Sequence, residues 1–202
     1  IAEAEFSGLI VSIGRWVLHE ACRQAASWNA QAGVALSVAV NLSAVQFVNG
    51  AVIRDIEDAL ASSGLDPRLL EIELTESVLL GQGDEIEKIL DGLRHLAVQR
   101  SIDDFGTGYS NLAYIKRFET DKLKIDRSFV ENMLSNERDR RLVRAIIDMA
   151  RDLQIRTVAE GVEEPALADA LRDMGCDEVQ GFLYARPMAS ADFDKWLREA
   201  LC

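Results

Sequence analysis

The stretch Asp103-Asp104-Phe105-Gly106-Thr107-Gly108 contains the residue types most suited to chemistry. Two adjacent carboxylates follow a short apolar run, and a Gly-rich turn follows them. Neighbouring carboxylates repel each other, so such a pair needs cations or protons nearby. Oxygen ligands suit Mg²⁺ or Mn²⁺. The stretch therefore predicts a divalent-cation site; the alternative is a solvated Asp-Asp turn that caps a helix.

Other polar side chains stand at the ends of further predicted strands. In chain order the whole set is Asn41, Glu73, Asp103, Asp104, Lys124, Glu160 and Gln180. One strand-end carboxylate is usually a solvated or capping residue, but chance does not readily explain so many in succession. Such oxygen ligands could hold a pair of divalent cations that activates water and stabilises displacement at phosphorus.

The spacing of apolar residues predicts alternating strands and helices along the whole chain. Strands are predicted at residues 34–40, 69–75, 98–102, 121–125, 155–159 and 178–181. Helices are predicted over residues 9–31 and around 53–60, 86–93, 112–115, 142–153, 167–174 and 193–201. Such alternation is typical of a parallel sheet covered by helices.

The positions of the polar residues distinguish two folds of this class. A doubly wound open sheet places its site at one switch point, which few strand ends reach. A (β/α)₈ barrel builds its site at the carboxyl ends of all its strands. Because every predicted strand ends on polar groups, we expect an α/β, TIM-like barrel. The chain supplies six βα units of the eight-stranded barrel, so its N-terminal part is expected to be missing.

The amino-acid composition limits the kinds of molecule that the chain is expected to bind. The formal net charge of −12 argues against a protein that neutralises the phosphates of a nucleic acid duplex. It permits a small phosphate substrate, because bound divalent cations reverse the local charge. Cys22, Cys176 and Cys202 have no metal-binding spacing and indicate reduced thiols in the cytoplasm. No apolar run approaches the ~20 residues of a membrane helix, so no membrane contact is expected from this segment.

The motifs together resemble those of a known family. They are Asn41-Leu42-Ser43, Glu73-Leu74-Thr75-Glu76, the stretch from Asp103 to Ser110, Lys124-Ile125-Asp126, Ala159-Glu160-Gly161-Val162-Glu163 and Gln180-Gly181-Phe182. In order and spacing they resemble the motifs of EAL domains, bacterial cyclic di-GMP phosphodiesterases with a barrel fold. The resemblance runs from Phe6 to the last helix, so residues 1–202 are expected to be one N-terminally incomplete EAL-type domain.

The resemblance implies a role for each motif residue. The implied metal ligands are Asn41, Glu73, Asp103 and Asp104, with Asp103 bridging two Mg²⁺ or Mn²⁺ ions. The implied catalytic residues are Lys124, which orients the attacking water, Glu160 at the metal site or as general base, and Gln180 in the water network. Glu76 resembles the glutamate that anchors the loop at 105–110. Asp126 and Glu163 are secondary candidates.

The implied reaction is hydrolysis of cyclic di-GMP to linear pGpG in second-messenger signalling. The first alternative is a non-catalytic cyclic di-GMP receptor that acts through a protein partner, and the second is a barrel enzyme for another phosphorylated or carboxylate substrate. The family context also allows a homodimer, a fused sensory or GGDEF domain outside this chain, and a cytoplasmic domain whose parent protein is membrane-anchored.

Two departures from the family pattern stand out. The strand with the Glu-Ala-Leu motif that names the family, which supplies one metal-ligand glutamate, is expected to lie before Ile1, and we expect no copy of the motif in the chain. The 202 residues are then a fragment of a longer protein and are expected to be inactive alone. Arg100 stands where an apolar residue is expected; an unpaired buried arginine is costly, so we expect its head group to reach the rim of the barrel.

Other readings of single residues have less support. Asp104-Phe105-Gly106 matches one protein-kinase motif, but the other kinase motifs are missing. Three tryptophans, Trp16, Trp28 and Trp196, have the spacing of packing residues. The two histidines, His19 and His95, have no companion ligands and are expected to serve packing or the surface.

Overall fold

The computed structural model describes residues 1–47, 51–76, 78, 83–108, 115 and 118–200, without the side chains of 83–85. The chain forms two compact units. The first unit comprises Ile1–Leu74, Gly81–Arg100 and Pro187–Cys202, and the second comprises Thr75–Leu80 and Ser101–Arg186. Each unit is described by itself.

The strands follow one another in the sheet in the order of the sequence, β1-β2-β3-β4-β5-β6. Their bounds are Val38–Asn41, Leu70–Thr75, Gln99–Phe105, Lys122–Ile125, Arg156–Ala159 and Glu178–Val179. The pairs β1–β2, β3–β4, β4–β5 and β5–β6 are parallel. A doubly wound sheet would reverse its order at a switch point, whereas a barrel adds strands in sequence. The order confirms the predicted TIM-like arrangement of six βα units.

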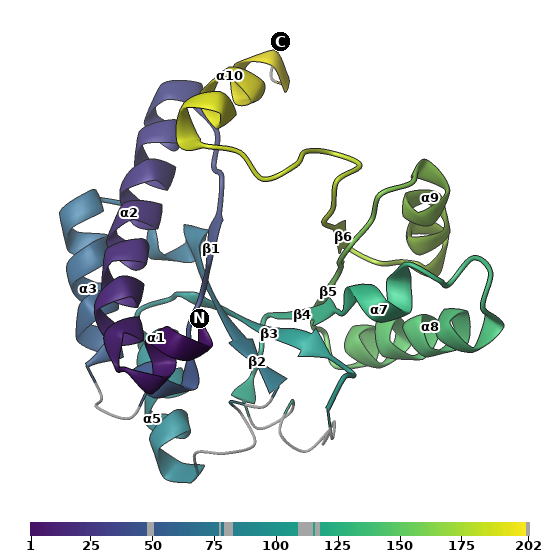
Figure 1. Ribbon diagram of the computed structural model, residues 1–202, viewed down its shortest axis with the longest axis horizontal. Helices are drawn as coiled ribbons and strands as arrows, with labels where there is room; N and C mark the ends of the chain where they lie inside the picture. Colours follow the sequence, from purple (N-terminus) through teal and green to yellow (C-terminus); the bar gives the residue numbers. More distant parts are fainter. Residues whose placement is uncertain (48–50, 77, 79–82, 109–114, 116–117, 201–202) are drawn as a thin grey trace. The chain divides into compact units, whose positions relative to one another are not determined.

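The first unit packs helices on β1 and β2. Its helices are α1 (Ala2–Phe6), α2 (Leu9–Ala32), α3 (Val52–Ser63), α5 (Gly83–His95) and α10 (Ser190–Ala200), with short 3₁₀ turns η1 (Ala44–Gln46) and η2 (Pro67–Leu69). Helices α2 and α3 lie side by side (Figure 1). The buried face of α2 includes Leu18 and Cys22. Trp28 holds α10 to α2, because its ring centroid is 4.5 Å from that of Phe193 and its Nε1 donates to Asp194 at 2.5 Å.

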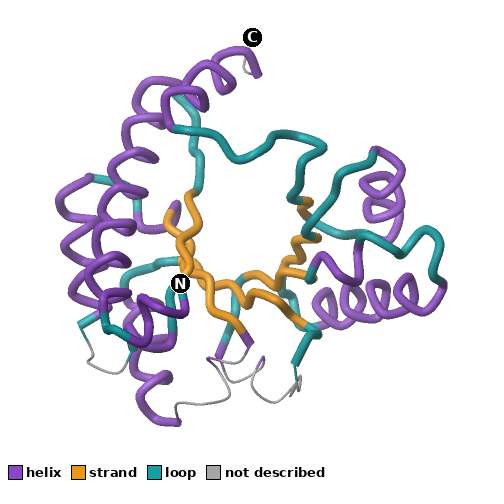
Figure 2. Tube along the Cα trace, viewed as in Figure 1, coloured by secondary structure: helices purple, strands orange, loops and turns teal. Residues whose placement is uncertain are grey.

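In the second unit, strand β4 pairs with a strand on each side. The helices of this unit are α7 (Arg127–Val130), α8 (Glu137–Asp152) and α9 (Pro165–Met174). Helix α8 contacts β4 and β5 (Figure 2). Its buried residues include Val143, Ile146 and Ile147. Leu123 and Ile125 on β4 are fully buried. Apolar residues on one face of β4 therefore leave its other face for Lys122 and Lys124, since strand side chains alternate.

Several elements differ from the predictions. β1 begins only at Val38, because the Asn29 side chain binds both the N–H and the C=O of Leu36 at 2.7 and 3.0 Å and holds that segment outside the strand. Helices α1 and α7 were not predicted. The helix predicted at 112–115 lies outside the described residues except for Ile115.

The three tryptophans and Arg100 agree with the predictions only in part. Trp28 and Trp196 pack as expected, but the packing role of Trp16 is wrong, because 67% of that residue is exposed. Arg100 is 9% exposed and is not without an interaction partner, so the costly unpaired arginine is avoided. None of the helices in the described ranges has both the length and the hydrophobicity needed to cross a bilayer.

Candidate functional site

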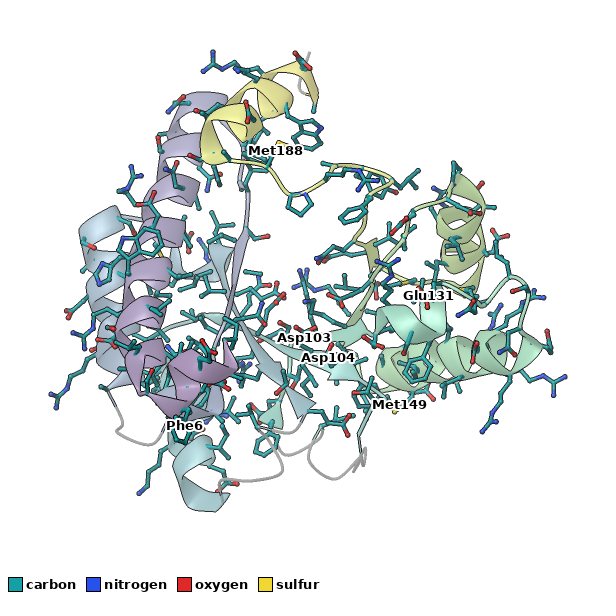
Figure 3. The ribbon with its side chains drawn as sticks, in the orientation of Figure 1. Phe6, Asp103, Asp104, Glu131, Met149 and Met188 are labelled. Atoms are coloured by element: carbon teal, nitrogen blue, oxygen red, sulfur yellow. The ribbon has the colours of Figure 1, made fainter. Side chains whose placement is uncertain are left out.

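The end of β3 carries Asp103 and Asp104 on an irregular stretch of strand. Ile102 pairs with Leu123 and Phe105 with Ile125, so three steps along β3 match two steps along β4. The extra residue is a β-bulge, which re-aims side chains that a regular strand would send to opposite faces. Asp104 has a φ of 55°, a left-handed conformation that Asp tolerates better than most residues. The bulge thus brings the two neighbouring carboxylates together (Figure 3).

This geometry corrects the predicted strand 98–102. β3 continues through Phe105, so the two aspartates belong to the strand and do not follow it. The alternative of a solvated turn that caps a helix is wrong for the same reason. The backbone N–H of Asp104 donates to Oδ1 of Asp103 at 3.0 Å, which fixes the first carboxylate beside the bulge.

Lys124 lies between two of the acidic groups. Its Nζ is 3.0 Å from Oδ1 of Asp103 and 2.8 Å from Oε1 of Glu160. Only 6% of the lysine side chain is exposed. A charged lysine so deeply buried requires such partners, because an unpaired buried charge is costly. The three residues come from β3, β4 and the end of β5, so the parallel register assembles them.

A cluster of acidic oxygens completes this part of the site. Ligand atoms of Asp103, Asp104 and Glu160 lie within 4.8 Å of one another. Partial burial and then the charges of Asp103 and Asp126 raise the pKa of Asp104, while Lys124 lowers it. Two of these three carboxylates contact Lys124, and the remaining negative charge suits a hard cation that prefers oxygen ligands. The residues present fit a divalent metal ion.

Glu76 lies against the Gly-rich turn. Its Oε2 accepts a hydrogen bond from the backbone N–H of Gly106 at 3.3 Å. A Cβ added to Gly108 would lie 3.4 Å from the Glu76 carboxylate, so the loop backbone approaches it closely. Oε1 of Glu76 is buried and has no hydrogen-bond partner in the part of the chain that the structure describes. This arrangement agrees with an anchor for the turn and leaves an acceptor for one more donor.

The secondary candidates make structural contacts in the second unit. Asp126 caps the short helix α7 through hydrogen bonds from the N–H and hydroxyl of Ser128. Glu163 pairs with the guanidinium of Arg127, 3.0 Å away, at the surface. Gln180 follows β6, and its backbone N–H donates to the carbonyl of Ala159 at 2.8 Å. The structure therefore brings Asp103, Asp104, Lys124 and Glu160 together and gives Asp126 and Glu163 other partners.

Asn41 and Glu73 form a separate pair in the first unit. They are register partners at the ends of β1 and β2, and Nδ2 of Asn41 donates to Oε2 of Glu73 at 2.7 Å. Glu73 is 5% exposed. The amide and the carboxylate both present oxygen atoms, so the pair retains the character of metal ligands that the sequence suggested.

The sequence-based interpretation missed one buried charged residue, Lys122. Lys122 lies two residues before Lys124 on the same face of β4, and its Nζ is 2.9 Å from Oε2 of Glu178. The period of two in Lys122-Leu123-Lys124 was a signal that could have found it. The two histidines serve packing or the surface, as expected. A ring nitrogen of His19 lies within hydrogen-bond distance of the Ser62 hydroxyl, and one of His95 lies within that distance of the Asp91 carbonyl.

Comparison with known proteins connects this geometry to a family. The model of the family described as EAL domain matches residues 1–187. The chain belongs to the EAL domain family. Among curated relatives of this EAL domain, signaling protein YkoW of Bacillus subtilis is 42% identical over 199 residues, covering 98% of this chain and 25% of YkoW.

MucR of Pseudomonas aeruginosa, a bifunctional diguanylate cyclase/cyclic di-GMP phosphodiesterase, is 44% identical over 185 residues, 92% of this chain and 27% of that protein. The chain therefore spans about a quarter of the length of these relatives. The solved structure of PaMucR phosphodiesterase in a c-di-GMP complex matches with a TM-score of 0.90 and 44% identity, covering 95% of this chain and 78% of that one.

The naming motif of the family needs a correction. The letters Glu-Ala-Leu do occur, at residues 199–201, so the expectation that the chain has no copy is wrong. Glu199 and Ala200 belong to helix α10, and Leu201 lies outside the described residues. Glu199 and Ala200 thus lie in a helix, whereas the resemblance implies a strand for the family's own motif.

Proposed function

We propose that this EAL domain hydrolyses one phosphodiester bond of cyclic di-GMP and releases linear pGpG. The observation that carries the proposal is the cluster of Asp103, Asp104 and Glu160 around Lys124. Relatives support the choice of substrate: MucR and NbdA of Pseudomonas aeruginosa, the latter 41% identical over 198 residues, are both named cyclic di-GMP phosphodiesterases.

The acidic groups would hold two divalent cations, Mg²⁺ or Mn²⁺. Asp103 would bridge them, and the other protein ligands would be Asn41, Glu73 and Asp104. When bound, such ions lower the pKa of a coordinated water and offset negative charge at phosphorus. The fit rests on the oxygen donors of Asp103, Asp104 and Glu160, whose ligand atoms lie within 4.8 Å of one another.

Lys124, Glu160 and Gln180 would act on the water and the phosphate. The Lys124 ammonium lies 3.0 Å from Asp103 and 2.8 Å from Glu160, so it would place positive charge beside an attacking water or a phosphate oxygen. Glu160, 2.8 Å from this ammonium, would accept a proton from that water. Gln180 would donate and accept hydrogen bonds in the same network.

Three further residues would support the site from outside it. Glu76 would hold the turn of Gly106 and Gly108 through the hydrogen bond to the Gly106 N–H. Asp126 would order the start of α7 just after Lys124, and its charge contributes to the raised pKa of Asp104. Glu163 would fix the segment after Glu160 through its pair with Arg127.

A turnover assay of the full-length protein with cyclic di-GMP and Mg²⁺ tests the proposal. Formation of pGpG that EDTA abolishes and Mg²⁺ restores would support it. Binding of cyclic di-GMP without hydrolysis, over a range of Mg²⁺ and Mn²⁺ concentrations, would favour a receptor that acts through a protein partner. Neither binding nor hydrolysis would leave the third class, a barrel enzyme with another phosphorylated or carboxylate substrate.

The setting of the domain follows from the same proposal. Cyclic di-GMP is an intracellular messenger, so we propose a cytoplasmic domain, including when the parent protein is anchored in a membrane. A homodimer and a fused sensory or GGDEF domain are the proposed macromolecular partners. The diguanylate cyclase named in MucR supports the second of these.

A further inference from the structure

Strand β6 is too short to be held by its own ladder. It comprises only Glu178 and Val179, which pair with Val158 and Ala159 of β5. Strands of ordinary length have about five or six residues, so a strand of two needs other restraints to keep its register. Gln180 follows directly, and its position depends on how firmly β6 is held.

Hydrogen bonds between Asp177 and Thr157 restrain the amino-terminal end of β6. Oδ2 of Asp177 accepts hydrogen bonds from the backbone N–H and the hydroxyl of Thr157 at 2.8 and 3.0 Å. The N–H of Asp177 donates back to Oγ1 of Thr157 at 3.3 Å. Thr157 is 1% exposed, so water competes little for these bonds. They join the residue before β6 to β5.

Glu178 restrains the same strand end toward β4. Its Oε2 is 2.9 Å from Nζ of Lys122, and its Oε1 is 3.3 Å from Nη1 of Arg156. One carboxylate thus joins β6 to β4 and β5. Lys122 is 7% exposed, whereas the Glu178 side chain is 41% exposed. Because Lys122 is buried, water screens this pair less than it screens an ion pair between two exposed side chains.

The carboxyl end of β6 carries the proposed chemistry. The N–H of Gln180 donates to the carbonyl of Ala159 at 2.8 Å, and its carbonyl accepts from the N–H of Val162 at 3.0 Å. A Cβ on Gly181 would lie 2.1 Å from the carbonyl oxygen of Val162, so the two backbones touch. These bonds fix Gln180 relative to the segment that contains Glu160, provided that β6 keeps its register.

We propose that Glu178 is a positioning residue that, through Lys122 and Arg156, holds β6 in register and so keeps Gln180 beside the segment of Glu160. The role in catalysis rests on the proposed function of the domain. The structural role of Glu178 does not rest on that function, because the backbone hydrogen bonds that it protects exist without substrate. Glu178 touches no reacting atom and acts only through Gln180.

The first experiment measures hydrogen exchange in the full-length protein without ligand. Glu178→Gln keeps the shape of the side chain but removes its charge, and Glu178→Ala removes both contacts. We expect the amides of Gln180, Val162 and Leu183 to exchange about tenfold faster in Glu178→Gln, while the midpoint of thermal unfolding changes little.

Glu137→Gln is the matched control. Like Glu178, Glu137 pairs with two cationic side chains, with its carboxylate oxygens 3.0 Å from Arg141 and 4.0 Å from Arg140, but on the exposed surface of α8. It should leave the three amides unchanged. Unaltered exchange at these amides in both Glu178 variants would overturn the proposal, as would a uniform increase over the whole domain, which would mean that Glu178 serves only general stability.

The second experiment separates this proposal from the proposed function. If the wild-type protein hydrolyses cyclic di-GMP, Glu178→Gln should lower kcat about tenfold with little change in KM, because a displaced outer partner misplaces Gln180 without removing substrate contacts. An unchanged kcat despite faster local exchange would overturn the catalytic part. If the wild type does not hydrolyse the substrate, the proposed function fails, and the exchange experiment still decides whether Glu178 positions Gln180.

Discussion

The ends of β2 and β3 present carboxylates in two different ways. β2 is regular, so Glu71 and Glu73 share one face and Ile72 and Leu74 the other. At its end Glu73 accepts a hydrogen bond from the neutral amide of Asn41. β3 contains a bulge, and its Asp103 and Asp104 come together with Glu160 around a lysine. The carboxylate at the end of β2 thus contacts a neutral amide, whereas Asp103 and Glu160 contact a full positive charge.

This difference shows what a bulge contributes to a parallel sheet. A regular strand supplies at most one side chain per layer to a site, whereas a bulge supplies two adjacent ones. The cost is electrostatic, because partial burial and then repulsion by Asp103 raise the pKa of Asp104. A lysine and a metal ion are the groups that can relieve it. The second unit is therefore where substitutions should have the larger effects.

Asp103→Asn should have the largest effect on activity. It keeps the shape of the side chain but removes a charge from the proposed bridging ligand, so turnover of cyclic di-GMP should fall by more than the roughly 100-fold that loss of an outer partner costs. Turnover at saturating Mg²⁺ and the thermal midpoint would be measured in the full-length protein. Wild-type turnover in a folded variant would rule out the bridging role.

Lys124→Met should have the largest effect on stability. It leaves Asp103 and Glu160 without their shared cation, and we expect a loss of about 3 kcal/mol in the free energy of unfolding without metal. Adding Mn²⁺ should recover more stability in this variant than in the wild type, since the metal ion replaces the missing charge.

The control for Lys124 is Lys195→Met, which removes an exposed lysine 3.4 Å from Asp192. It should change stability by less than about 0.5 kcal/mol, with or without Mn²⁺. An equal response of both variants to Mn²⁺ would show that the metal does not bind where Lys124 supplies charge.

Glu76→Gln tests the anchor of the Gly-rich turn and should have a moderate effect. The hydrogen bond from the Gly106 N–H weakens when its acceptor loses its charge, so the apparent affinities for Mg²⁺ and substrate should fall while global stability changes little. Both affinities can be measured by titration calorimetry. Glu57→Gln, at an exposed position of α3, is the control, and affinities equal to those of the control would exclude an anchor.

Asn41→Ala should have the smallest effect on stability, about 1 kcal/mol, because it removes one hydrogen bond from Glu73. The control is Asn132→Ala, which removes an exposed amide–carboxylate bond of 3.4 Å to Glu131. Thermal unfolding without metal would compare the two. A loss in Asn41→Ala as large as that in Lys124→Met would contradict the distinction between the two strand ends.

The sequence by itself determined the alternation of strands and helices and the residue types at the strand ends. Periodicity is local, so it predicted α2 nearly to its last residue and all six strands. The motif series was equally local, and it indicated the family to which the chain belongs.

Only the tertiary structure decided how those residues act on one another. The bulge in β3 depends on its register with β4, and no local pattern in Ile102-Asp103-Asp104-Phe105 reveals it. The Asn29 side chain shortened β1 through a contact that period-two patterning cannot show. The pairing of Lys122 with Glu178 joins residues 56 positions apart. Such contacts form only when distant segments pack, because hydrogen bonds and ion pairs depend on distance in space and not on distance along the chain.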